Sequence, residues 1–163
     1  FMGGVDNWFG PRYNSATPIA TDANYAYQTL ATNMRGFIQN IRNGNNFMLI
    51  NSELRFPVFN YLFNRPLRSD LLNSFQVVGF MDAGTAWNGI SPFSDDNRLN
   101  TQIVQQGGLT ITLDQQKNPL VMGYGFGLRA RVLGYYLRAD WAWGVEDGLV
   151  LPRVFYLSST LDF

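Results

Sequence analysis

The amino-acid sequence predicts an all-β fold in the form of a transmembrane antiparallel β-barrel. Apolar residues recur at every second position in five segments, which is the period of a β-strand rather than of a helix. The segments are about ten to thirteen residues long, whereas strands of soluble proteins have about five to six residues and membrane-spanning strands about 9–11. The opposite face of each segment carries single charges, amides and glycines, which suits a crowded, wet interior.

The composition of the chain narrows the classes of function. Lys+Arg and Asp+Glu both number 12 in the 163 residues, so no charge excess points to nucleic acid as a partner. The chain has no cysteine and no histidine, which excludes disulfides, Cys/His zinc sites and histidine-based triads. No run approaches the roughly 18 consecutive apolar residues of a membrane helix. We therefore expect no cofactor and no metal, and because the first residues lack the pattern of a signal peptide, we expect a piece of a longer protein.

Five strands are expected, and in each the apolar side chains share one face. The strands are residues 47–58, 75–87, 121–132, 135–144 and 155–163. The residues expected to face lipid are Met48, Ile50, Leu54, Phe56, Val77, Met81, Tyr124, Phe126, Leu137, Trp141 and Leu157. The residues expected to face inward include Asn51, Glu53, Asp82, Arg129, Arg138 and Asp140. A shift of one residue in the pairing would exchange the two faces throughout the sheet.

Turn residues separate these strands, and the connections alternate in length. Residues 59–74 and 133–134 are expected to be turns at one end, and the longer segments 88–120 and 145–153 connect strands at the other. Within 88–120 the sequence GLTITLD is expected to form a hairpin outside the main sheet. Aromatic residues near strand ends fit the interface girdle of a membrane barrel, namely Trp87, Tyr135, Trp141, Trp143 and Phe163.

Two soluble folds share the alternation. A β-sandwich exposes its polar face to water and readily accepts Lys and Glu there, whereas here Lys117 is the only lysine and the polar face is rich in glycine and arginine. A soluble ligand-binding barrel would line its pocket with the aromatic residues, and solubility without detergent would distinguish it from a membrane barrel.

A single carboxylate stands out in residues 75–87, FQVVGFMDAGTAW, where Asp82 is the one charged residue. Residues 32–40, TNMRGFIQN, are predicted to form a loop that carries Arg35. The planar guanidinium could bind the carboxylate through two parallel hydrogen bonds, with Phe80 packed against its plane. From the chemistry alone a second pairing stays open, in which Asp82 binds Arg129 or Arg131 and Arg35 lies in solvent.

Two motifs in this order resemble those of the BamA-like outer-membrane barrels, the bacterial surface antigen family. MRGF resembles the family's arginine-glycine-aromatic loop motif, and GFMDAGTAW resembles its Phe-x-Asp-x-Gly strand motif. The matching positions are Arg35, Gly36 and Phe37 in the loop and Phe80, Asp82 and Gly84 in the strand. NSELRFP is similar to the strand after the loop, and LRADWAW with FYLSSTLDF is similar to the last two strands with their terminal aromatic residue.

The resemblance extends from around Leu30 to the end, and Met34 stands where the family usually has valine. The asparagine-rich loop and the GGVDNW opening resemble variants from the Bacteroidetes. The resemblance implies that residues 1–163 are the C-terminal part of a sixteen-stranded barrel in the bacterial outer membrane. Residues 1–46 would be the long motif loop with a strand end, and residues 47–163 the last five strands.

The same resemblance implies a function and partners. The expected function is the non-enzymatic insertion, assembly or translocation of polypeptides at the outer membrane, with Arg35 bound to Asp82 inside the barrel. The expected partners are outer-membrane lipid, unfolded or translocating polypeptides, and accessory proteins of the periplasm or the outer membrane. A seam between the first and last strands would open laterally. Its last-strand half contains Phe155, Leu157, Leu161 and Phe163.

The other inward charges allow two interpretations. These residues are Glu53, Arg55, Arg129, Arg131, Arg138 and Asp140. They would either neutralise one another as a lumen wall or form a polar conduit for substrate.

The alternative to a C-terminal part of a large barrel is a self-contained small barrel that acts as a passive pore or adhesin. Its additional strands would have to come from residues 1–9, 23–34 and 102–113, whose alternation is poor.

Overall fold

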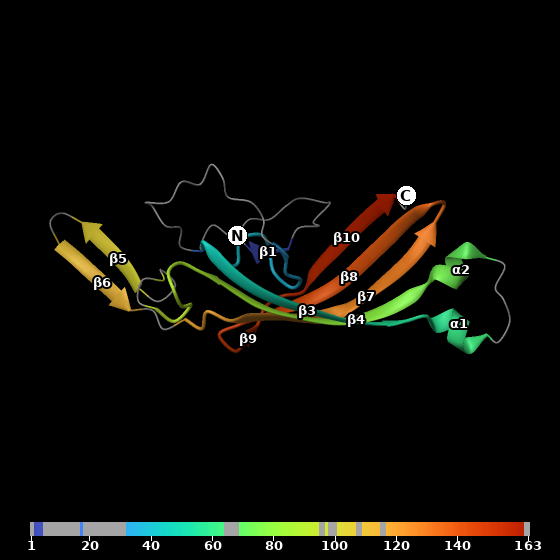
Figure 1. The fold of residues 1–163 in the computed structure, drawn as a ribbon, viewed down its shortest axis with the longest axis horizontal. Helices are drawn as coiled ribbons and strands as arrows, with labels where there is room; N and C mark the ends of the chain where they lie inside the picture. Colours follow the sequence, from blue (N-terminus) through green and yellow to red (C-terminus); the bar gives the residue numbers. More distant parts are fainter. Residues whose placement is uncertain are drawn as a thin grey trace.

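Figure 1 shows the computed structural model, which describes residues 2–4, 17, 32–63, 69–94, 97, 101–106, 109–114 and 117–161. Its main element is an antiparallel sheet with the strand order β10-β8-β7-β4-β3. The strands are β3 (Asn46–Phe56), β4 (Gln76–Trp87), β7 (Val121–Val132), β8 (Tyr135–Glu146) and β10 (Val154–Leu161). The five predicted strands are all present, and the all-β, antiparallel fold class is confirmed.

Two short helices replace the turn predicted at residues 59–74. Helix α1 (Val58–Leu62) follows Pro57, which ends β3 because proline has no backbone N–H for the sheet. Helix α2 (Asp70–Ser74) leads into β4. Helices this short depend on tertiary packing, and here the ring of Phe59 lies 5.3 Å from that of Phe75. Over the residues that the structure describes, no helix is long and apolar enough to cross a membrane.

The remaining elements lie outside the five-strand sheet or at its end. Strands β5 (Thr101–Gln106) and β6 (Leu109–Asp114) pair with each other, which confirms the hairpin expected outside the main sheet, and Figure 1 shows it beyond one end of the sheet. Strand β9 (Leu149–Val150) pairs with the end of β8. Strands β1 (Met2–Gly3) and β2 (Thr32–Asn33) form a short parallel pair that the sequence pattern did not predict.

A tight turn connects β7 and β8. Leu133 and Gly134 have φ angles of 52° and 83°, and two successive positive φ angles are typical of the two-residue turn whose twist matches that of a hairpin. The turn sets Val132 opposite Tyr135 and thereby fixes the pairing of both strands along their length.

The pairing places the predicted inward residues on one face of the sheet. Asp82 lies opposite Asn51 of β3 and Gly123 of β7, and Gly127 lies opposite Asp140 of β8. The other face exposes large apolar side chains, such as Leu54 at 79% and Ile50 at 59%. The division of the side chains between two faces is the one predicted from the sequence.

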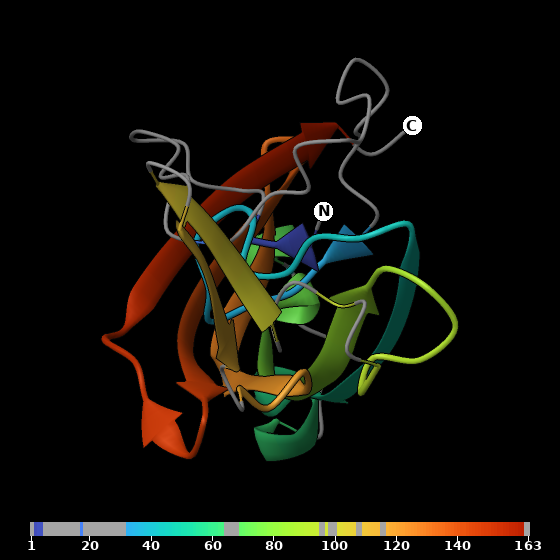
Figure 2. The same cartoon turned by 90° about the vertical axis from the view of Figure 1, so that its left-hand side faces the viewer.

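The sheet curves around the loop that carries Arg35, so that one face is concave (Figure 2). An apolar core lies between this loop and the sheet, and it consists of Met2, Met34, Phe37, Ile41, Ala86 and Val121. A second cluster contains Phe80, Ala142 and Tyr156. The core therefore holds the loop segment 34–42 against the concave face.

The sheet is open at both sides. Within the described part of the chain, the outer edges of β3 and β10 have no strand paired to them. Residues 102–113, a strand candidate for a small closed barrel, lie mostly in the separate β5–β6 hairpin. The other two candidates, residues 1–9 and 23–34, lie mostly outside the described residues, as does Phe163.

Aromatic rings form a ladder across the exposed face of β7, β8 and β10. Phe126 and Trp141 are stacked with ring centroids 5.4 Å apart, and Tyr124 and Trp143 are stacked at 6.0 Å. Trp141 also lies 5.1 Å from Phe155 of β10. The ladder connects three successive strands on the face opposite the loop.

We expect the Phe126 and Trp141 rings to be energetically coupled. A double-mutant cycle with Phe126→Leu and Trp141→Leu should give a coupling of about 0.5–1.5 kcal/mol in denaturant unfolding, because stacked rings contribute beyond their buried area. The control cycle combines Trp141→Leu with Leu54→Ala on β3, where additivity is expected. Equal couplings in the two cycles would contradict a specific ring contact.

Candidate functional site

The tip of the loop reaches the sheet because glycines leave room for its backbone. Gly36 has a φ of +96°, which side-chain-bearing residues rarely adopt, and a Cβ there would lie 2.7 Å from the backbone of Trp143. On the sheet, a Cβ at Gly123 would overlap the carbonyl of Arg35, and one at Gly144 would lie 2.6 Å from the Gly36 oxygen. The loop therefore lies directly on the backbones of β7 and β8.

The structure brings Arg35 and Asp82 together. The guanidinium donates from Nε to Asp82 Oδ2 at 2.7 Å and from Nη2 to Asp82 Oδ1 at 2.6 Å. The backbone N–H of Arg35 also donates to Oδ2 at 3.2 Å. The Arg35 side chain is 4% exposed and that of Asp82 is 0% exposed. This is the two-pronged, charge-assisted geometry that a planar guanidinium forms with a carboxylate.

Two further groups surround the Arg35 guanidinium. Its Cζ lies 3.7 Å from the ring centroid of Phe80, which is a cation–π contact. Its Nη1 donates to Oε1 of Glu53 on β3. Burial lowers the pKa of Arg35, but the hydrogen bonds and charges of Asp82 and Glu53 outweigh this effect and raise the pKa above its ordinary value. Arg35 therefore remains charged.

A second group of charges lies beside the first on the concave face. Arg129 donates from Nη1 to Oδ1 of Asp140, and Arg138 donates from Nε to Asp140 Oδ2 at 2.7 Å. Arg129 Nη2 also lies 3.6 Å from Glu53 Oε1, which joins the two groups. The pairing of Asp82 with Arg129 or Arg131, which the sequence left open, is not the one present.

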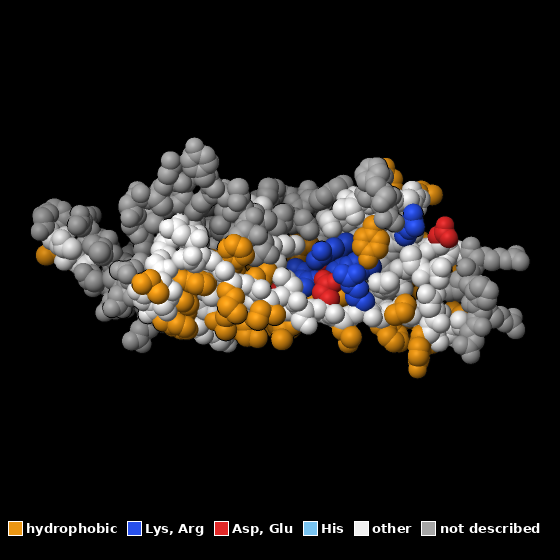
Figure 3. All heavy atoms as spheres, viewed as in Figure 1, with side chains coloured by type: hydrophobic (Ala, Val, Ile, Leu, Met, Phe, Trp, Pro, Cys, Tyr) orange, Lys and Arg blue, Asp and Glu red, His pale blue; other side chains and the backbone are white. Residues whose placement is uncertain are grey.

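The outermost of the predicted inward charges are more exposed. Arg55 binds Glu53 Oε2 through Nε at 3.0 Å and Nη2 at 2.8 Å, and its side chain is 58% exposed. The backbone N–H of Arg131 donates to Ser74 Oγ at 2.9 Å, which ties the end of β7 to helix α2. Figure 3 shows basic and acidic side chains gathered at the middle of the molecule, with apolar side chains along the lower edge in that view.

The loop tip has a second anchor on β10 that sequence reasoning missed. The hydroxyl of Tyr156 donates to the carbonyl of Phe37 at 2.6 Å and accepts from the N–H of Gly36 at 3.0 Å. Tyr156 is 3% exposed. The available signal was a tyrosine at an inward position of the strand, where a buried hydroxyl needs a partner.

Arg42 is a second missed residue, at the other end of the loop. It is 1% exposed and donates from Nη1 to Glu146 Oε1 at 2.7 Å and from Nη2 to the carbonyl of Asn118 at 3.1 Å. Glu146 is the last residue of β8. The pair therefore fixes the C-terminal part of the loop to the end of the sheet that lies away from α1 and α2. The signal in the sequence was Glu146, which the alternation along residues 135–146 places on the inward face, where a carboxylate needs a cationic partner.

The other predicted site residues pack in the core or lie on β10. Phe37 is 1% exposed in the apolar core, and Gly84 faces Leu49 and Met2 so closely that a Cβ would lie 2.7 and 2.9 Å from them. Phe155 and Leu157 point to the exposed face of β10, opposite Trp141 and Ala139. Leu161 ends that strand.

The arrangement can hold a loop in place, and each carboxylate in it is bound to arginine. Asp82, Glu53 and Asp140 all accept hydrogen bonds from guanidinium groups. Among the described residues, no three acidic side chains gather in the manner of metal ligands.

Comparisons of this chain with family models, with curated proteins and with solved structures found no match. The site is therefore interpreted from its own geometry.

We expect the contributions of Arg35 and Asp82 to the stability of the fold to depend on each other. Arg35→Ala and Asp82→Ala should each cost about 3–5 kcal/mol in unfolding free energy, because each removes the two-pronged partner of a buried charge, and Glu53 binds only the remaining nitrogen of Arg35. The double mutant should cost clearly less than the sum. Arg35→Lys should restore little, because an ammonium lacks the planar fork.

The matched control for the Arg35 series is Arg55→Ala, since Arg55 also binds Glu53 but is 58% exposed. Its cost should be about 0–1 kcal/mol, as for other exposed ion pairs. Strict additivity of Arg35→Ala and Asp82→Ala would contradict the pairing.

We expect the glycines under the loop to be intolerant of a methyl group. Gly123→Ala should displace the loop, because its Cβ would overlap the Arg35 carbonyl. Gly79→Ala is the control, since a Cβ there meets nothing within 4 Å. Protease cleavage within the loop, measured on folded protein, should rise for Gly123→Ala only. Equal cleavage of the two variants would show that the loop does not need the bare backbone.

Proposed function

We propose that this chain is the C-terminal part of an outer-membrane β-barrel that inserts, assembles or translocates polypeptides. The observation that carries the proposal is the loop on the concave face, held by the Arg35–Asp82 pair, beneath a sheet whose other face is apolar. An inward face of paired charges and an outward apolar face are what a lipid-embedded strand layer requires.

The exposed face supports contact with lipid. It displays Met48, Ile50, Leu54, Phe56, Met81, Tyr124 and Phe126, each at least 43% exposed. Soluble monomers rarely leave so large a continuous apolar patch in water. In water this surface would be an aggregation hazard, whereas hydrocarbon would cover it.

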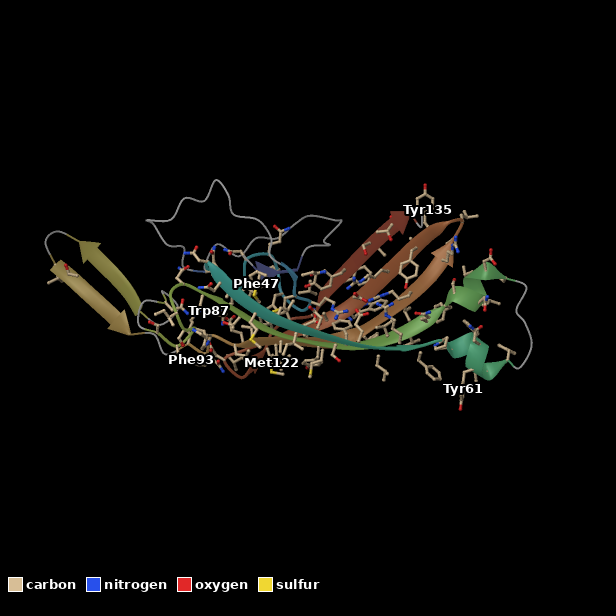
Figure 4. All side chains as sticks on the ribbon, in the orientation of Figure 1. Phe47, Tyr61, Trp87, Phe93, Met122 and Tyr135 are labelled. Carbon is tan, nitrogen blue, oxygen red and sulfur yellow. The ribbon has the colours of Figure 1, made fainter. Side chains whose placement is uncertain are left out.

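The helices α1 and α2 extend this apolar surface at the end of the sheet. Tyr61 is 75% exposed, and its ring lies 5.3 Å from that of Phe56 at the end of β3. Figure 4 shows Tyr61 pointing away from the side on which the loop lies, as Met122 does at the opposite part of the sheet. Aromatic residues at strand ends are typical of a membrane interface girdle.

The open edges support a larger barrel. The described strands leave β3 and β10 without outer partners, and lipid contains no water to satisfy such edges. A membrane barrel must close, so further strands of the same protein would pair with β3 on one side and approach β10 on the other. In the proposal the closed barrel has sixteen strands and lies in the bacterial outer membrane.

The mechanism uses a contrast between a fixed loop and a releasable strand edge. The loop is bound to β4, β8 and β10 by Asp82, Glu146 and Tyr156, so this wall of the barrel stays ordered. The outer edge of β10 presents free backbone donors and acceptors when its seam opens. An incoming polypeptide can add to that edge as a strand. The process requires no chemical step, so we assign no enzymatic activity.

The partners in this proposal are those that the resemblance of the motifs implies. Lipid contacts the apolar face, the substrate is an unfolded or translocating polypeptide, and accessory proteins act from the periplasm or the outer membrane. A self-contained pore or adhesin is the competing function, and it requires this chain to close a barrel alone.

Lipid contact can be tested by spin-label accessibility of the full-length protein in liposomes. Labels at cysteines replacing Ile50, Met81 and Tyr124 should be accessible to oxygen, which concentrates in lipid. A label at Asn51, on the opposite face of β3, should instead be accessible to a water-soluble nickel relaxant. The contrast should alternate with each residue along β3, because successive side chains point to opposite faces. Absence of this alternation would contradict a membrane-spanning sheet.

The function can be tested by reconstitution. Liposomes that contain the full-length protein should accelerate the insertion of an unfolded outer-membrane β-barrel client relative to empty liposomes. Asp82→Ala should reduce this acceleration, while Arg55→Ala should retain it. A closed, ion-conducting barrel formed by residues 1–163 alone, without acceleration of insertion, would favour the pore instead.

A further inference from the structure

The hydroxyl of Tyr156 connects the Arg35 loop to strand β10. It donates a hydrogen bond to the Phe37 carbonyl and accepts one from the Gly36 N–H. The two bonded groups flank the peptide bond between Gly36 and Phe37. The two bonds fix the position of the loop relative to β10 in a way that packing alone does not, because hydrogen bonds are directional.

The strand that carries Tyr156 is the last in the sheet order. It is held by its pairing with β8, where Tyr156 lies opposite Asp140. Its other edge has no partner strand within the described residues. Any movement of β10 away from β8 would carry Tyr156 with it and would break the bonds to the loop, which is bound separately to Asp82 on β4.

The ring and the hydroxyl of Tyr156 make different contacts, which a substitution can separate. The ring belongs to the cluster with Phe80 and Ala142, and Phe80 in turn packs on the Arg35 guanidinium. Tyr156→Phe therefore keeps the ring packing and removes only the two hydrogen bonds. The Phe37 carbonyl would keep its bond from the N–H of Gly4, at 3.1 Å, so the loss falls mainly on Gly36.

We propose that Tyr156 is a positioning residue that couples the seated state of the Arg35 loop to the closed state of β10. This rests on the proposed function, in which the β10 edge opens to accept a polypeptide. Loop seating would stabilise β10 against β8, and opening of β10 would loosen the loop by the same free energy, because coupling between two sites is reciprocal.

The first measurement follows the loop in the full-length protein. Met34 is 0% exposed, so a cysteine at that position should react with maleimide only when the loop leaves its seat. Tyr156→Phe should raise the labelling rate about tenfold, which corresponds to about 1.4 kcal/mol. Tyr136→Phe is the matched control, because Tyr136 lies on the same face of β8, opposite Arg131 and Thr160, and should leave the rate within about twofold.

The second measurement follows β10 by hydrogen exchange of its backbone amides. Asp82→Asn releases the loop and should speed exchange in β10 when Tyr156 is present. In the Tyr156→Phe background the same substitution should have an effect on β10 at least about threefold smaller, because the connection is already broken. A merely structural tyrosine would give the same Asp82→Asn effect in both backgrounds.

The outcomes separate this inference from the proposed function. Unchanged Met34→Cys labelling in Tyr156→Phe, or an Asp82→Asn effect on β10 that does not depend on Tyr156, would overturn the coupling while leaving the insertion assay unaffected. Coupling as expected, in a protein that inserts no client into liposomes, would overturn the proposed function and leave the loop–strand connection in place.

Discussion

A buried guanidinium must be paired, and the Arg35 side chain is 4% exposed. Its pairing with Asp82 determines what surrounds it. The loop must approach the sheet closely, which requires bare backbone at Gly123 and a positive φ at Gly36. The guanidinium plane must be covered, which Phe80 does. The uncovered nitrogen, Nη1, requires another acceptor, which Glu53 provides. The positions of Gly36, Gly123, Phe80 and Glu53 all follow from the burial of the Arg35 charge.

The charges of the concave face form one connected set rather than separate pairs. Glu53 accepts from Arg35 and from Arg55 and lies 3.6 Å from Arg129, while Asp140 accepts from both Arg129 and Arg138. Each carboxylate thus has more than one cationic neighbour, or one bound through two nitrogens. In a site of low dielectric constant such a network is stable only when every member is satisfied. This favours the interpretation of these residues as a mutually neutralised wall over that of a conduit.

The sequence pattern predicts the strands and their two faces well, because alternation over long segments has one solution for which side is buried. It predicts the Arg35–Asp82 pairing less firmly: the chemistry allowed Arg129 as the partner, and only the resemblance of MRGF and FMDAG to known motifs favoured the loop. The helices α1 and α2 were missed because five-residue helices have too little periodicity to be recognised and depend on contacts such as Phe59 with Phe75. Tyr156 was missed because its partners are backbone groups of a loop, whose path no local pattern determines. Arg42 was missed because it lies on that loop, so no local pattern places it beside Glu146.

The anchors of the loop differ greatly in their separation along the chain. Arg35 and Asp82 are 47 residues apart, whereas Gly36 and Tyr156 are 120 apart. Contacts of high sequence separation form late, since the entropy of closing a long loop opposes them. The bond to Asp82 becomes available when β4 has formed, and the bonds to Tyr156 only when β10 has joined the sheet. A chain that stops before β10 would therefore hold its loop by Asp82 and Glu146 but not by Tyr156, so that full fixation of the loop reports that β10 has joined the sheet.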